Sequence, residues 1–286
     1  MCRWLGYYGN PMRPDWLLYR TPRGLIDQSY EAREMERPIN ADGFGMGWYP
    51  GNGELPGLYR NVAPAWSDRN LRELAAHIEA PLFLAHVRAS TGTPVQQTNC
   101  HPFRHGRWLF VHNGYVAGYE LLRRELLFAV DPGLFGSVEG TTDSELLFHL
   151  ALTFGLEEEP LAALERMAGF VEERGYARGI ESPLQMTVGV SDGERLYALR
   201  YASGTTANTL YVSTCVDDLK RLYPASREVQ KLSEEARAVV SEPLSELPGT
   251  WHEVPAATAL IIQPGADEEV PFVPRAPRDG GRRTPP

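Results

Sequence analysis

The sequence has few cysteines and no long apolar run. Its three cysteines, Cys2, Cys100 and Cys215, are odd in number and widely spaced, and no CxxC pair occurs. This pattern excludes a disulfide framework and a zinc ribbon, and it fits reduced thiols in the cytoplasm. No stretch approaches the roughly 20 apolar residues of a membrane span, and no signal-length apolar run opens the chain. We therefore expect a cytoplasmic protein that does not enter a membrane.

The sequence also lacks an excess of basic residues and the motifs of common cofactor sites. Its net charge of −9 argues against nucleic acid or anionic lipid as the main partner. We find no phosphate-binding loop, no Rossmann fingerprint and no metal-ligand cluster, so we expect neither a cofactor nor a metal. With 286 residues, the chain is long enough to bury a sizeable core without disulfides.

Strand-like and helix-like segments follow one another in blocks. Strands come first, helices follow, and from about residue 184 short apolar strands separated by turns return. This order predicts an α+β fold with mostly antiparallel sheet. We expect one domain over residues 1–272 and a disordered tail over residues 273–286, which is rich in Pro, Gly and Arg and has no apolar anchor. Strands are expected at 1–9, 81–87, 107–112, 184–190, 195–201, 209–214, 236–241 and 258–264, and helices at 67–80, 118–130, 140–154 and 161–175.

Cys2 is the first residue whose position suggests chemistry. Its small side chain suits removal of Met1 by methionine aminopeptidase, which would place a thiol and an α-amine in one residue. The ordinary pKa of such an amine is near 8, so the amine is partly neutral at working pH. It could take the proton of the thiol and later return it to a leaving amine. The alternative is that Cys2 is only a small residue at the start of a strand.

Four further residues offer complementary chemistry, each with an ordinary structural alternative. Arg88 ends a buried strand and presents a fork for a carboxylate, or it forms a surface ion pair. Asn113 and Gly114 end the next strand and could form an oxyanion hole, or a hairpin turn. Asp143 could bind an ammonium, or it is a helix-start carboxylate favoured by the helix dipole. Glutamine, with its amino-acid head and its carboxamide, satisfies the whole set.

The segments that carry these residues resemble the motifs of the class II glutamine amidotransferases, which are N-terminal nucleophile hydrolases. They are MCRWLG, AHVRAST, NCHPF, HNG with the following YELLRREL, and TTDSELLFHL, and the resemblance runs from residue 1 to about residue 155. It implies a four-layer αββα sandwich with two antiparallel sheets face to face.

The resemblance also implies a role for each matching residue. Cys2 becomes the nucleophile once Met1 is gone, and Asn113 and Gly114 form the oxyanion hole. The run RASTGTP departs from the sugar-phosphate enzymes of this class, with Ala89 and Gly92 where they often have tryptophan and histidine. This departure puts sugar-phosphate amination in doubt and leaves the glutaminase chemistry in place.

The remaining matches imply how the substrate is held. Arg88 binds the α-carboxylate of glutamine with help from Thr91, and Asp143 binds the α-ammonium. His101 lies where the family often has a histidine near the site, and it either contacts the substrate or makes a structural hydrogen bond.

The chain leaves no room for a synthase domain beside this fold, so we expect a stand-alone glutaminase-type enzyme. It would cleave glutamine for a separate synthase subunit, or hydrolyse a γ-glutamyl amide as relatives in ergothioneine synthesis do. A non-catalytic amino-acid sensor remains a further alternative. A protease dyad of Cys100 and His101 is disfavoured, because adjacent residues of an extended loop point in opposite directions.

Overall fold

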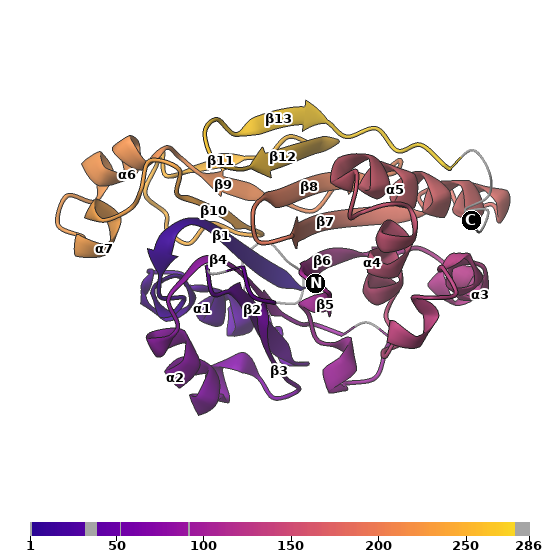
Figure 1. The fold of residues 1–286 in the computed structure, drawn as a ribbon, viewed down its shortest axis with the longest axis horizontal. Coiled ribbons are helices and arrows are strands. Elements are labelled where there is room, and N and C mark those ends of the chain that lie inside the picture. Colours follow the sequence, from indigo (N-terminus) through magenta and orange to yellow (C-terminus); the bar gives the residue numbers. More distant parts are fainter. Residues whose placement is uncertain (1, 32–38, 52, 91, 278–286) are drawn as a thin grey trace.

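The structure is a computed structural model that describes residues 2–31, 39–51, 53–90 and 92–277. Two antiparallel sheets lie face to face (Figure 1). Within the described residues, the first sheet has seven strands, in the order β11 (Trp251–Glu253), β9 (Tyr211–Ser213), β10 (Arg237–Val240), β1 (Arg3–Met12), β4 (Ala80–Val87), β2 (Phe44–Tyr49) and β3 (Gly57–Asn61). The second has six, in the order β13 (Glu268–Pro271), β12 (Thr258–Ile262), β8 (Leu196–Ala202), β7 (Leu184–Ser191), β6 (Trp108–Val116) and β5 (Phe103–His105).

Helices cover the outer face of each sheet. The first sheet is covered by the π-helical turn η1 (Trp16–Arg20) and by α1 (Leu25–Tyr30), α2 (Arg69–His77), α6 (Val216–Leu222) and α7 (Arg227–Gln230). The second is covered by α3 (Tyr119–Ala129), α4 (Asp143–Thr153) and α5 (Pro160–Ala177) (Figure 1). Short 3₁₀ turns span Ala65–Ser67, Gln97–Asn99 and Phe135–Ser137. The αββα layering implied by the resemblance is confirmed.

Alternation along the central strands explains the layers. Successive side chains of a strand point to opposite faces, and in β1 Leu5 and Tyr7 pack under the helices while Trp4 packs between the sheets. In β6, Phe110 faces the helices of the second sheet and Leu109 faces the inter-sheet core. Both faces of each sheet are therefore buried over much of their area, which is why these strands are rich in large apolar residues.

Strand β2 lies in a glycine-dense segment in which no strand is expected from the sequence. It pairs with β4 on one side and β3 on the other. A Cβ atom at Gly45 would lie 2.2 Å from the carbonyl oxygen of His101, and one at Gly47 would lie 2.8 Å from Leu109. The glycines are needed because other parts of the chain approach the strand closely.

Strand β6 does not end at Asn113 and Gly114. It continues to Val116, and both residues pair with β7, Asn113 opposite Thr187. The expectation that Asn-Gly ends this strand is therefore wrong, and so is the hairpin-turn alternative. A Cβ atom at Gly114 would lie only 1.9 Å from the carbonyl oxygen of Gln185, so the ladder requires glycine there.

Helix α4 begins as its sequence predicts. The side chain of Thr142 accepts a hydrogen bond of 3.2 Å from the backbone N–H of Glu145. The carboxylate of Glu145 accepts from the backbone N–H groups of Glu139 and Gly140 instead of reaching back to Thr142. Thr142 therefore caps the helix, while Glu145 ties the preceding loop to it instead of completing a capping box.

The two other cysteines differ in environment. Cys100 is fully buried and its Sγ donates to the carbonyl oxygen of Asn61 at 3.4 Å, as expected for a packing residue. The sequence favours a packing role for both residues, and for Cys215 this prediction is wrong: it is exposed at the start of α6 and donates to Asp218 Oδ2 at 3.1 Å. Among the described residues, no helix is long and apolar enough to cross a bilayer.

The last described residues run along α5. Phe272 is buried in the core of the second sheet, and the N–H of Arg275 donates to the carbonyl oxygen of Glu165 at 3.1 Å. A Cβ atom at Gly169 would lie 2.3 Å from the backbone of Arg275, so the helix and this segment touch. Residues 278–286 of the expected tail lie outside the described part of the chain.

Candidate active site

Cys2 directly precedes β1, which is the middle strand of the first sheet. The ladder between β1 and β4 begins with Arg3 opposite Val87, which places Cys2 beside Arg88, the residue that follows β4. Its Sγ donates to the carbonyl oxygen of Ala89 at 3.6 Å. Strand β1 also contacts β6 of the second sheet, so it lies where the two sheets meet.

Two opposite charges act on the Cys2 thiol. Burial raises its pKa, while the positive charge of Arg88 lowers it and the negative charge of Asp143 raises it. Both charges therefore act on the same thiol, although Arg88 follows a strand of the first sheet and Asp143 begins a helix on the second.

Arg88 is a buried cation, with 3% of its surface exposed. Its Nη1 donates to the carbonyl oxygens of Asp42 and Pro94 at 3.3 and 3.2 Å, and its Nη2 donates to Ser90 Oγ and Thr93 Oγ1 at 3.2 and 2.7 Å. All four acceptors are neutral oxygens, and within the described part of the chain the guanidinium has no carboxylate partner. A carboxylate can bind the guanidinium by displacing one of these neutral oxygens. Thr91, its expected helper, lies outside the described residues.

Asp143 is fixed between helix α4 and strand β6. Its Oδ2 accepts from the backbone N–H of Val116 at 2.9 Å, and its Oδ1 accepts from the N–H and Oγ of Ser144 at 2.7 and 3.2 Å. These contacts hold the carboxylate at the helix start, where the helix dipole favours its charge. The link to Val116 sets its position relative to Asn113, three residues earlier on the same strand.

Asn113 is fixed by its main chain, whereas its side chain is not. Its carbonyl oxygen accepts from Thr187 Oγ1 and from Asn208 Nδ2, each at 3.4 Å. Its side-chain Oδ1 is buried and has no partner in the described part of the chain. Because a buried amide is normally hydrogen-bonded, this side chain is suited to a partner supplied by a ligand.

Three buried histidines lie behind these residues. The rings of His86 and His101 stack with centroids 4.0 Å apart, and His86 Nε2 lies 3.2 Å from the carbonyl oxygen of His112. Burial lowers the pKa of His86 to about 3, and it also lowers the pKa values of His101 and His112. All three are uncharged near neutral pH.

His101 is held by ring stacking. Both of its ring nitrogens are buried and have no partner among the residues described, so the structural hydrogen bond that we considered is not seen there. Its ring also packs against Phe103, with centroids 4.5 Å apart. A direct contact of His101 with a substrate stays a prediction.

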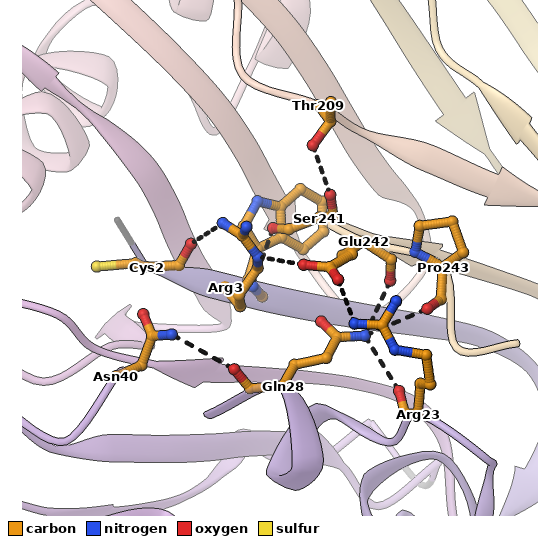
Figure 2. Close-up of polar contacts among 10 residues, drawn as sticks. Cys2, Arg3, Arg23, Gln28, Asn40, Thr209, Ser241, Glu242 and Pro243 are labelled. Atoms are coloured by element: carbon orange, nitrogen blue, oxygen red, sulfur yellow. Dashed lines mark hydrogen bonds and ion pairs between the residues drawn. The ribbon is translucent and has the colours of Figure 1, made fainter. Parts of the chain in front are cut away.

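A polar network on the other side of Cys2 was missed by the sequence interpretation. Arg3 Nη1 donates to the carbonyl oxygen of Cys2 at 3.1 Å, and Arg3 Nε donates to Glu242 at 3.1 Å (Figure 2). Arg23 pairs with the second oxygen of the same carboxylate. The one available signal is an arginine at a strand position flanked by apolar residues, which does not identify its partners.

The described residues contain no group of three or more His, Cys, Asp or Glu side chains that could hold a metal ion.

Two facing antiparallel sheets between helical layers, with a cysteine opening a central strand, define a fold of the N-terminal nucleophile hydrolase type. The chain belongs to the class II glutamine amidotransferases, whose family model matches residues 26–279. Members of this group act on amide C–N bonds. The match begins after Cys2, so it supports the family without covering the proposed nucleophile.

Individual relatives agree with this assignment. The probable glutamine amidotransferase DUG3 of Saccharomyces cerevisiae is 32% identical over 293 residues, covering 92% of this chain and 82% of that protein. The γ-glutamyl-hercynylcysteine sulfoxide hydrolase of Mycobacterium tuberculosis is 37% identical over 118 residues, covering 41% of this chain and 50% of that one.

Solved structures show the same fold. A glutamine aminotransferase class-II domain protein from Silicibacter pomeroyi superimposes with a TM-score of 0.72 at 35% identity, covering 96% of this chain and all of that one. The B. subtilis glutamine phosphoribosylpyrophosphate amidotransferase has a TM-score of 0.64 at 15% identity, covering 96% of this chain and 50% of its own. At that identity, the second likeness concerns the fold alone.

Proposed function

We propose that, after removal of Met1, Cys2 attacks the γ-carbonyl carbon of glutamine or of a γ-glutamyl amide and forms a γ-glutamyl thioester. The observation that carries this proposal is the position of Cys2 beside the end of β4, where its Sγ donates to the carbonyl oxygen of Ala89 at 3.6 Å and the charges of Arg88 and Asp143 both act on the thiol. A free amino acid carries a carboxylate and an ammonium, and these two side chains complement that pair of charges.

Arg88 and Asp143 hold the amino-acid head. The α-carboxylate replaces neutral oxygens such as Thr93 Oγ1 on the guanidinium, because a charged acceptor makes a stronger hydrogen bond than a hydroxyl. The α-ammonium lies against Asp143, whose oxygens keep their backbone donors from Val116 and Ser144. With both ends fixed, the carboxamide is held in one orientation toward the thiol.

The α-amine of Cys2 serves as the base. Burial raises the pKa of the thiol, so it is protonated at neutral pH and its proton must leave as the C–S bond forms. None of the three buried histidines hydrogen-bonds to Cys2 Sγ among the described contacts, and all are uncharged. The amine accepts the thiol proton and passes it to the leaving nitrogen. Water then cleaves the thioester, giving glutamate and regenerating the thiol.

Asn113 and Gly114 stabilise the negative oxygen of the tetrahedral intermediate. The side-chain Nδ2 of Asn113 and the backbone N–H of Gly114 are the proposed donors. One donor of this kind typically contributes about 10²–10³ in rate.

Two leaving groups remain to be distinguished. Release of ammonia from glutamine would serve a separate synthase subunit in the cytoplasm, where the thiol stays reduced. Release of a larger amine is the second candidate, and similarity to the mycobacterial hydrolase favours it. A Cβ atom at Gly92 would meet no atom within 4 Å, so the loop beside Arg88 leaves space at that position.

The test is a substrate screen with Met1-processed protein, verified by intact mass. Glutamine and a series of γ-glutamyl amides are assayed for glutamate, ammonia and released amine, with Cys2→Ala as the control. We expect glutamate from at least one substrate with wild-type protein and none with the variant. Equal activity of the two proteins would overturn the proposal, and so would the absence of turnover of every γ-glutamyl amide.

A further inference from the structure

The residue that would carry out the reaction lies beyond the strand pairing that holds the rest of β1. Pairing with β4 begins at Arg3, and pairing with β10 begins at Leu5 opposite Val240. Chain ends without partners fray, and a terminal nucleophile has to be held in one place. The carbonyl oxygen of Cys2 is held instead by a side chain, through the bond of 3.1 Å from Arg3 Nη1.

The guanidinium of Arg3 is itself fixed. Arg3 and Glu242 are 2% and 1% exposed, and Arg23 bonds to the same carboxylate from the other side. Gln28 Nε2 donates to the carbonyl oxygens of Arg23 and Glu242, each at 3.1 Å, and so fixes the backbone that carries both (Figure 2). Breaking a buried ion pair is strongly destabilising, so Arg3 has little freedom to leave the carbonyl.

Arg3 lies on the side of Cys2 away from the thiol. Figure 2 shows the sulfur and the carbonyl oxygen of Cys2 pointing in opposite directions, with Arg3 on the carbonyl side. Arg3 therefore leaves the sulfur accessible to substrate, and any effect it has on the reaction passes through Cys2.

We propose that Arg3 is the positioning residue of the nucleophile: Glu242 and Arg23 hold its guanidinium on the Cys2 carbonyl, which fixes the terminal residue and keeps a positive charge within one residue of its α-amine. This inference rests on the proposed function, because it assumes that the amine is the base.

The charge has a consequence with a definite sign. A nearby cation disfavours the ammonium form, so Arg3 and Arg23 favour the neutral amine, while Glu242 opposes them. The titratable groups that face Cys2 from other elements are Arg88, Cys100 and Asp143. These groups remain the same in every variant described below. A difference in the amine pKa between variants therefore reports the network of Arg3, Arg23 and Glu242 alone.

The experiment compares pH profiles of kcat/KM for wild type, Arg3→Met, Arg23→Gln and Glu242→Gln, using glutamine and γ-glutamyl-4-nitroanilide. The acidic limb of each profile is the rise in kcat/KM with pH as the amine loses its proton. With either arginine replaced, we expect this limb to move to higher pH by about 0.5–1 unit, and with Glu242→Gln to lower pH by a similar amount. Arg3→Met should also lose about tenfold in kcat, because the carbonyl anchor is gone, whereas Arg23→Gln should not. Arg3→Lys should restore the limb.

A second readout does not depend on turnover. The pH dependence of acetylation of the Cys2 α-amine by acetic anhydride is followed on the N-terminal peptide by mass spectrometry, with the thiol first capped as a methyl disulfide so that no S-to-N acyl transfer occurs. It reports the pKa of the amine. We expect the same opposite movements of that pKa in Arg3→Met and Glu242→Gln. If wild type cleaves no γ-glutamyl amide, the proposed function fails, while the amine pKa still decides whether the network acts on Cys2.

A matched control separates electrostatics from loss of stability. Arg237 forms an ion pair with Asp267 at 2.7 Å at the other end of β10. Arg237→Gln should lower the melting temperature and leave the acidic limb in place. The inference is overturned if Arg3→Met and Glu242→Gln move the amine pKa in the same direction, or if both lower the melting temperature without moving it.

Discussion

Trp4 on β1 and Thr187 on β7 are joined across the space between the two sheets by a hydrogen bond of 3.0 Å from the indole Nε1 to Thr187 Oγ1. The same hydroxyl lies 3.4 Å from the carbonyl oxygen of Asn113. The strand that begins beside Cys2 is thus tied to the strand that carries the proposed oxyanion donor, and their separation is set by one buried indole.

Trp4→Phe tests this link. Loss of one buried hydrogen bond costs about 1 kcal/mol, which corresponds to a decrease of about 2–4 °C in melting temperature for a chain of this size. Because nucleophile and oxyanion donor then drift apart, we expect kcat to fall about tenfold while KM changes little. Thermal unfolding and steady-state kinetics measure both effects.

The control is the double variant with Thr187→Val. If the hydrogen bond carries the effect, adding Thr187→Val to Trp4→Phe should cost little more than either change alone. Additive losses would show that the two residues act independently.

Arg88→Gln and Asp143→Asn should weaken substrate binding. Each removes a charge that complements the amino-acid head, so we expect KM to rise about 10- to 100-fold with a smaller change in kcat. Glutaramate, which lacks the α-amine, should be cleaved equally by wild type and Asp143→Asn. Normal KM values in both variants, or a large effect of Asp143→Asn on glutaramate, would refute these roles.

Local sequence signals predicted much of the fold, because they reflect local physics. Asp68 accepts from the N–H of Leu71 at 2.7 Å and caps α2, as its position before an apolar periodic segment indicates. The apolar runs of β4, β6 and β7 mark strands buried on both faces. A shared role of Arg88, Asp143 and Cys2 in holding one substrate stays a prediction, drawn from chemical complementarity together with the family resemblance.

What the sequence did not predict depends on tertiary contacts. Glycine has a low strand propensity, so Gly45 locally disfavours a strand. Glycine is needed there because the carbonyl oxygen of His101, more than fifty positions away in the sequence, approaches the strand closely. Asn113 followed by glycine favours a turn, yet pairing with β7 overrides that preference. Arg3 and Glu242 lie at opposite ends of the chain, and nothing local in either segment marks them as partners.

Acid should destabilise the protein through its buried histidines. Their pKa values are lowered in the folded state, to about 3 for His86 and well below the ordinary value for His101. Below about pH 6.5 the histidines of the unfolded chain take up protons, while those of the folded chain stay neutral. The free energy of unfolding therefore has its full value above that pH and falls as the pH falls toward the folded-state pKa values. Each such histidine should contribute a slope of about 1.4 kcal/mol per pH unit.

Urea unfolding between pH 7 and 4 measures this slope. His101→Gln should reduce it by the contribution of one proton. His77→Gln should leave it unchanged, because the side chain of His77 is 77% exposed. An unchanged slope in His101→Gln would show that this histidine is not buried and neutral in the native protein.

Gly114→Ala should disrupt the ladder between β6 and β7. The added methyl group would lie 1.9 Å from the carbonyl oxygen of Gln185, and backbone cannot move aside as a flexible side chain can. We expect a loss of about 10 °C in melting temperature, or an insoluble protein. Gly136→Ala, where the new Cβ meets nothing within 4 Å, should behave like wild type. Similar melting of both variants would contradict the described register.

Covalent trapping of the nucleophile tests the central claim most directly. Met1-processed protein carrying Cys215→Ser, which removes the exposed thiol, is treated with the glutamine analogue 6-diazo-5-oxo-L-norleucine and mapped by peptide mass spectrometry. The account predicts one adduct, formed with loss of N₂, on the N-terminal peptide that begins at Cys2, together with complete loss of γ-glutamyl amide hydrolysis. An adduct on Cys100, or continued turnover with Cys2 fully modified, would contradict it.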